Sequence, residues 1–352
     1  MGYRIVIYMK VEIPEQLKAD VPPTVWGKML AATPVVMAVV ATMLAGLSSS
    51  EMTRAQYDRS LAAQQQSKAG DQWSFFQAKR LRGAFQRHTL DLLQSMTDLH
   101  PLDAAAIPSA IDQLCAQAPP ARQAEASKTK TDLLALLNSA TGKQMITSLQ
   151  SGELPAAGKP PELAPNIKAA AVAVENLKPD AEMAALLAPI DTLALEAMVH
   201  ISWEHSQALD DATKPLNDAV DRLETQVLRL AACAQQPASS AVASVGTGGS
   251  ATLTRDITAA RLRYTALRYE AEARLNQGIA SLYELQVRKS NISADRHHRR
   301  SQRFFIGMLG AQLGVIISTF AMAARKRNLL WSLAAGAGVL AIAFAVYVYL
   351  YV

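Results

Sequence analysis

The sequence is short of charge, of aromatic side chains and of cysteine. Charged residues are 18% of the 352, against about 25% in typical soluble domains, so the chain has little charge with which to cover a globular surface. Aromatic residues are 6%, which argues against an all-β protein. Disorder needs low hydrophobicity and high net charge, whereas 50% of the residues are apolar and the net charge is +5.

The sequence also lacks the short motifs that mark many enzymes. It has no glycine-rich phosphate loop, Walker motif, Gly-x-Ser-x-Gly elbow or CxxC pair. We therefore expect no enzyme, no cofactor and no small-molecule substrate. The two cysteines, Cys115 and Cys233, would pair if they face an oxidising space, or serve as small buried thiols in their Ala-rich surroundings; both readings stay open.

Three long runs contain no charged residue: 29–47, 304–324 and 329–352. A bilayer core about 30 Å thick needs roughly 20 apolar residues of helix, so each run predicts a transmembrane helix. The first lies too deep for a cleaved signal peptide and lacks a short basic start, which favours a retained anchor. Aromatic residues stand where interfacial anchors belong: Trp26, Phe304, Phe305, Trp331, Tyr347, Tyr349 and Tyr351.

Proline divides the rest of the chain, because it interrupts helix interiors. None of the 16 prolines lies in 35–100 or 238–352, so each stretch can form a long helix continuous with a span. The proline-rich middle predicts shorter helices, over 102–117, 121–150, 162–177 and 180–235. The predicted segments are an N-terminal segment (1–25, with Met9 an alternative start to Met1), span 1 (26–47), a stalk helix (48–100), a helical cap (101–237), a flexible linker (238–251), a coiled-coil stalk helix (252–303), span 2 (304–324), a basic turn (325–328) and span 3 (329–352).

The second long helix has a row of residues at steps of four and three, the coiled-coil spacing. The row is Leu253, Ile257, Ala260, Tyr264, Leu267 and Ala271, and after a stutter Leu275, Ile279, Leu282 and Gln286. This predicts an all-α integral membrane protein with three transmembrane helices, a long antiparallel coiled-coil-like stalk and a helical cap. An ordinary helical-bundle face is the alternative for the row.

Several strings resemble a known bacterial membrane-protein family, the domain of unknown function DUF4337. They are DQWSFFQAK at 71–79, RHHRRSQRFF at 296–305 before the second span, a short RKR turn before Trp331 and the third span, and VEIPEQ at 11–16. The resemblance covers 11–95 and 255–352 and leaves out the middle. It implies an integral inner-membrane protein of helical hairpin type, with no established activity.

Basic and aromatic residues flank the predicted spans, and we expect them to contact lipid headgroups. They are Trp26, Arg296, His297, His298, Arg299, Arg300, Arg303, Arg325, Lys326, Arg327 and Trp331. A pH sensor at the two histidines is the alternative, since histidine titrates near neutrality. Eight basic residues near the span ends on the stalk side, against six on the other, favour a cytoplasmic large domain. The short RKR turn favours the periplasm, which stays open.

Small residues in the second span predict close helix packing: Gly307, Gly310 and Gly314. Gln312, near the middle of that span, needs a partner in lipid. We expect a hydrogen bond between helices, and a pore-lining role is the alternative.

Two further groups of residues are an aromatic cluster and a set of potential metal ligands. Trp73, Phe75 and Phe76 lie near several basic residues, but these are local and the net charge is low, so we expect core or interface packing and no nucleic acid. Glu196, His200 and Glu204 share a helix face and are weak metal candidates, because a closed site needs four ligands.

The sequence therefore favours a non-enzymatic scaffold of the bacterial inner membrane that contacts lipids and works as a homo-oligomer. The alternatives are a channel or transporter subunit built around Gln312 and a membrane-anchored metal enzyme.

Overall fold

The computed structural model describes residues 25–154, 160–234, 248–323 and 327–351, and within these ranges the chain contains helices and no strand. The all-α prediction is confirmed for this part of the chain. Residues 1–24 of the predicted N-terminal segment 1–25, most of the linker and the basic residues Arg325 and Lys326 lie outside the described residues.

Two long helices dominate the chain, as the distribution of proline predicts. They are α2 (Val25–Met96) and α9 (Gly248–Ala323), and α10 (Arg327–Tyr351) follows α9. Helix α9 begins inside the predicted linker, and α2 ends before His100. The helices between them are α3 (Ala106–Ala116), η1 (Pro120–Arg122), α4 (Gln123–Asn138), α5 (Ala140–Ser151), α6 (Pro165–Glu175), α7 (Asp180–Leu187) and α8 (Thr192–Ala234).

Two predicted cap helices are interrupted. The predicted helix 121–150 breaks at Ser139, whose hydroxyl accepts a hydrogen bond from the backbone N–H of Gly142 and so caps α5. The predicted run 180–235 breaks before Thr192, and α7 and α8 meet at a bend of 89°. Pro215 lies within α8 without ending it.

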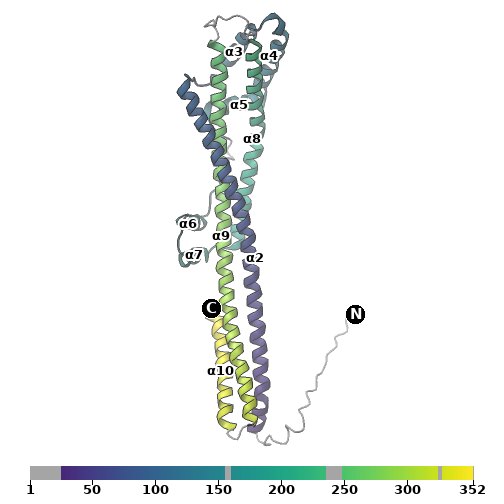
Figure 1. The fold of residues 1–352 in the computed structure, drawn as a ribbon, viewed down its shortest axis with the longest axis vertical. Coiled ribbons are helices and arrows are strands. Elements are labelled where there is room, and N and C mark those ends of the chain that lie inside the picture. The colour runs from purple at the N-terminus through teal and green to yellow at the C-terminus, as the bar shows by residue number, and fades with distance from the viewer. Residues whose placement is uncertain (1–24, 155–159, 235–247, 324–326, 352) are drawn as a thin grey trace, which may run out of the picture. The chain divides into compact units, whose positions relative to one another are not determined.

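The chain divides into two compact units, residues 1–62 with 290–352 and residues 63–289. In the first unit, α2, α9 and α10 share an apolar core (Figure 1). Its buried residues are Met37, Ala41, Leu44, Phe304, Ala311, Ala341 and Val348. Three helices of the described chain are long and apolar enough to cross a membrane, at the positions predicted; the bent pair α7 and α8 passes the same test of length and composition only when taken together.

In the second unit, the first part of α9 is surrounded by other helices. Figure 1 shows α3, α4, α5 and α8 gathered beside it. The main core cluster includes the predicted row residues Leu253, Ile257, Ala260 and Tyr264, packed against side chains of these four helices. Further along, Ala271 and Leu275 pack on Leu209 of α8.

The residues of the α9 row that belong to these clusters face α8 and the cap helices. Helix α2 packs on another side of α9, where Leu90 contacts Ala259 and Leu262. Because α9 buries several faces, it is the central helix of a bundle, which agrees with the bundle alternative.

Helix α2 carries a heptad row of its own that was not predicted from the sequence. From Ala62 to Leu90, a series of its buried and half-buried residues recurs at steps of three and four. They are Ala62, Gln65, Ala69, Gln72, Phe76, Lys79, Gly83, Gln86 and Leu90. We call this row the α2 seam. Most of its members are small or polar, so hydrophobicity alone does not reveal it.

Candidate functional site

Within the candidate spans, glycines make room for Met37. The Met37 side chain is buried, and a Cβ atom added at Gly314 or at Gly338 would clash with it. A Cβ at Gly307 would lie 3.5 Å from Leu44 Cδ1. Small residues thus allow close approach of α2, α9 and α10. Gly307 and Gly314 are two of the three glycines for which the sequence predicted close helix packing, and here they lie against Leu44 and Met37 of α2.

Gly310 and Gln312 do not share this role. A Cβ at Gly310 would meet nothing within 4 Å. Gln312 is exposed and makes no hydrogen bond to another described residue. Thr319, seven residues further along α9, is exposed as well and donates a hydrogen bond to the carbonyl oxygen of Ile316. The amide of Gln312 therefore points away from the chain's own helices.

A polar cluster joins α2 and α9 beside the candidate spans. Ser48 Oγ donates to the carbonyl oxygen of Ser301 at 3.0 Å, and Ser301 Oγ donates to that of Ser48 at 2.8 Å. Both serines are buried. About one helical turn away, His297 Nδ1 lies 2.5 Å from Glu51 Oε2, with 19% and 13% of the two side chains exposed. These contacts fix the register of the two helices.

The basic residues around this cluster differ in their surroundings. Arg296 and Arg299 are exposed, whereas His298, Arg300 and Arg303 are half-buried. His298 Nε2 lies 3.0 Å from the side-chain nitrogen of Gln302. Across the bundle, Trp331 donates from Nε1 to Thr33 Oγ1 at 2.9 Å. For all the basic and aromatic residues that flank the spans, the contacts with lipid headgroups stay predictions. This includes Trp26 and Arg327, whose side chains the structure does not describe.

The aromatic motif of α2 is split between two faces. Trp73 Nε1 donates to Glu284 Oε1 of α9 at 2.7 Å, and the ring meets Phe76 edge to face at 5.4 Å. Phe75, between them in the sequence, is 53% exposed. Trp73 and Phe76 thus pack α2 on α9, and Phe75 has no such role.

The same motif supplies a buried ion pair to the α2 seam. Lys79 contacts Glu272, a carboxylate that is 7% exposed, and Arg268 Nε lies 3.6 Å from the other oxygen of Glu272. Removing a partner of a buried charge is costly, so this group holds the helices together rather than forming an open site.

Tyr264 is the largest side chain that is fully buried in α9. Its hydroxyl has no hydrogen-bond partner among the described residues. Burial raises the pKa of Tyr264 above its ordinary value. The charges of Arg268 and Glu272 act on this pKa in opposite directions, after the larger effect of burial. We assign Tyr264 to packing.

The weak metal candidates do not form a site. His200 Nδ1 lies 3.2 Å from Glu204 Oε1, and 75% and 61% of these side chains are exposed. Glu196 is exposed on the same helix. Among the residues that the structure describes, no three His, Cys, Asp or Glu side chains are placed to hold a metal ion.

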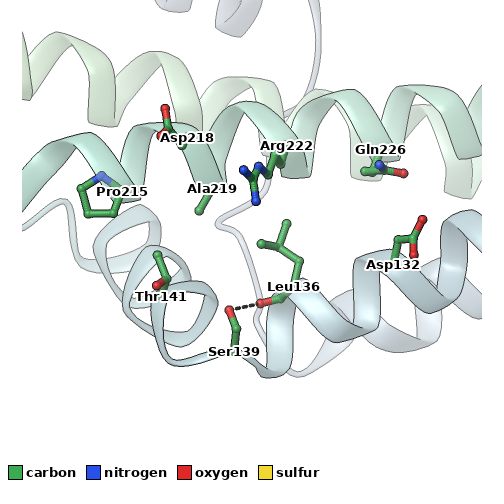
Figure 2. Close-up of a pocket in the computed structure, with 9 residues that line it drawn as sticks. All are labelled: Asp132, Leu136, Ser139, Thr141, Pro215, Asp218, Ala219, Arg222 and Gln226. Atoms are coloured by element: carbon green, nitrogen blue, oxygen red, sulfur yellow. Dashed lines mark hydrogen bonds between the residues drawn. The ribbon is translucent and has the colours of Figure 1, made fainter.

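A groove of about 550 Å³ lies between α8 and the junction of α4 and α5. Figure 2 shows Arg222 of α8 beside Leu136, with Asp132 and Asp218 on either side. Ser139 donates to the carbonyl oxygen of Leu136 at 2.6 Å and accepts from Gly142 N. Because its hydroxyl is used in capping and the lining contains no histidine, the groove lacks a nucleophile paired with a base.

Both cysteines are buried as free thiols in the main core cluster. Cys115 comes from α3 and Cys233 from α8. This agrees with the reading as small buried thiols.

Three residues of the polar cluster between α2 and α9 were not predicted from the sequence: Ser48, Glu51 and Ser301. A signal was present: Met37, Ala41, Leu44, Ser48 and Glu51 continue one series of steps of four and three. Following this spacing beyond the apolar run would have placed the two polar residues on the packed face of α2.

A family model described as domain of unknown function (DUF4337) matches residues 26–144. This confirms the resemblance seen in DQWSFFQAK, which lies inside the match. The match continues to residue 144, into the middle segment where we expected no resemblance, and does not include RHHRRSQRFF or the RKR turn. No curated protein and no solved structure matches the chain.

Proposed function

We propose that this chain is a non-enzymatic scaffold of a bacterial inner membrane, anchored by three transmembrane helices and assembled from several copies. The observation that carries the proposal is the outward position of Gln312. In lipid, an amide without a partner is costly, and the chain's own described helices offer it none. A second copy supplies one, because a glutamine amide both donates and accepts.

The arginine collar supports the membrane part of the proposal. Arg296, Arg299, Arg300 and Arg303 come directly before the apolar run that starts at Phe304. Basic groups at this height attract anionic lipid headgroups, each by about 1 kcal/mol. The collar would then hold α9 at a fixed depth.

The role of Gln312 is tested by measuring self-association in lipid vesicles. Gln312→Leu should weaken it about two- to threefold, because hydrogen bonds between helices in membranes average about 0.6 kcal/mol. Gln312→Asn, which keeps the amide, is the matched control. Equal association of all three proteins would remove the support for copies meeting at Gln312.

A channel or transporter subunit is the second candidate, favoured by the exposed pair Gln312 and Thr319 on one face of α9. If several copies turned this face toward a common axis, it would line a pore. A channel predicts ion flux through reconstituted vesicles that falls in Gln312→Leu. The scaffold predicts no flux in either protein.

We further propose that the large domain lies in the cytoplasm, from the count of basic residues near the span ends. Three spans place the C-terminus on the same side as the large domain. A reporter fused after Val352 should therefore be active in its cytoplasmic form, and periplasmic activity would reverse the orientation.

A further inference from the structure

Helix α9 carries a row of exposed and half-buried residues that runs from the arginine collar into the second candidate span. Steps of three and four lead from position 296 to position 313, so the members share one face of the helix. We call this the α9 mixed row. Its members are Arg296, Arg299, Arg303, Ile306, Gly310 and Leu313. The first three are basic and the last three are apolar, so the row changes character where the apolar run begins.

The basic end of the row gathers positive charge that the described chain does not neutralise. Like charges three or four positions apart destabilise a helix, and all four arginines of the collar stand at such spacings. Among the described residues, no carboxylate forms an ion pair with Arg299, Arg300 or Arg303. Two acids of the same unit, Glu51 and Asp295, pair with other basic side chains. The Nε atom of Arg300 is buried and has no hydrogen-bond partner in the described chain. The collar therefore lacks an anion.

The apolar end of the row narrows the choice of anion. Guanidinium groups bind phosphate with two parallel N–H donors, which favours a phosphate compound at the arginines. Directly beyond them, Ile306 is 60% exposed and Leu313 is 58% exposed. Between these two, a Cβ at Gly310 would meet nothing within 4 Å, so there is open space beside the backbone. A hydrocarbon chain covers such a surface, and a soluble phosphate does not.

We propose that the α9 mixed row, together with Arg300, is a binding site for one anionic phospholipid; this inference rests on the proposed membrane insertion of α9 and deepens the contact of the collar with headgroups. The lipid phosphate lies on the three arginines that have no acid partner, and an acyl chain follows the apolar half of the row. A phospholipid joins these two groups in the order in which the row presents them. Gln312 lies off the row, so the lipid and the proposed second copy use different faces of α9.

Native mass spectrometry of the full chain, titrated with dioleoyl phosphatidylglycerol, tests the basic end. Wild type should bind one such lipid before others and bind dioleoyl phosphatidylcholine much more weakly. The triple variant Arg299→Lys, Arg300→Lys, Arg303→Lys keeps the charge and loses the forked donors, so its affinity should fall roughly tenfold. Arg54→Lys is the control, because Arg54 already pairs with Glu51. A triple variant that binds as well as wild type, or an equal loss in the control, would reduce the collar to diffuse attraction and overturn the site.

The apolar end is tested by filling the open space. Gly310→Leu places a side chain where the acyl chain lies, so the affinity for phosphatidylglycerol should fall about fourfold for each methylene group displaced. Gly46→Leu is the matched control, since a Cβ at Gly46 also meets nothing within 4 Å and this glycine lies on α2. Competition with inorganic phosphate identifies the source of the phosphate. If Gly310→Leu binds the lipid as wild type does and inorganic phosphate displaces it, the site takes free phosphate and the lipid assignment is wrong.

Alkaline washing of membranes separates this proposal from the one on which it rests. If the wash releases the wild-type chain, the proposed membrane insertion fails and the lipid site fails with it. If the chain stays in the membrane and binds phosphatidylglycerol and phosphatidylcholine equally well, the lipid site alone is wrong.

Discussion

At the scale of single residues, the buried hydroxyl groups differ in whether they have a hydrogen-bond partner. Tyr264 places a hydroxyl without a described partner in the main core. Ser48 and Ser301, in contrast, satisfy each other. An unsatisfied buried group lowers stability and a mutually satisfied pair does not, so the two cases predict opposite responses to mutation.

Removing the Tyr264 hydroxyl should stabilise the protein. Tyr264→Phe keeps the ring and removes the unsatisfied group, so the free energy of unfolding should rise by about 1 kcal/mol. Denaturant unfolding of the detergent-solubilised protein measures it. A loss of stability would mean that the hydroxyl has a partner.

The same substitution has a predictable pH dependence. Because burial raises the pKa of Tyr264, the unfolded chain loses this proton first as the pH rises above about 10. Below that pH the phenol is protonated in both the folded and the unfolded state, so its contribution to the free energy of unfolding is constant. As the pH rises from there through the raised pKa of the folded protein, the wild-type protein loses this stability. The advantage of Tyr264→Phe should therefore grow above pH 10. An advantage that stays constant with pH would contradict burial of the phenol.

Two glycines in α9 should respond differently to a larger side chain. Gly314→Leu forces a side chain onto the buried Met37, and overpacking costs about 1–3 kcal/mol. Gly310→Leu adds the same side chain in open space and should change stability by less than about 0.5 kcal/mol. Thermal unfolding in detergent compares them, and equal losses would contradict the assignment of packed and open faces.

At the scale of the helices, the close packing of the α2 seam can be tested at a small buried residue. Ala69 is fully buried against α9, whereas Ala63 is exposed. Ala69→Leu should cost about 1–3 kcal/mol, because the seam has no room for it. Ala63→Leu is the control and should be near neutral. A neutral Ala69→Leu would mean that the two helices do not pack closely there.

The helices show what the sequence could and could not predict. The length of α2 and α9 followed from the absence of proline, a strong local signal. The α9 row was recognisable because Leu253, Ile257 and Tyr264 are large and apolar. The helix that packs on this row could not be predicted, because residue spacing indicates a buried face but not which helix covers it.

The α2 seam and the split of the aromatic motif between two helix faces were not predicted from the sequence, for a related reason. Ala69, Gln72 and Gly83 are buried by close helix approach, which a hydrophobicity pattern does not register. Phe75 and Phe76 look alike in the sequence, yet only Phe76 falls on the seam. Ser139 was predictable in hindsight, since serine before a helix is a strong N-cap signal.

At the scale of the whole molecule, the chain has little charge, and its exposed apolar residues are concentrated in a few regions. Part of the apolar content lies in the three candidate spans. Another part lies on α2 outside the spans, at exposed positions such as Phe85 and Met96. In the proposed membrane assembly, lipid and other copies would cover these surfaces.

The central claim is that the protein works as an assembly of copies in a membrane. The most direct test is the mass of the protein particle, extracted in mild detergent or in a native lipid disc, by native mass spectrometry. The account predicts a protein mass of at least twice the 37.9 kDa of one chain. A wild-type particle containing a single chain at all protein concentrations would contradict it.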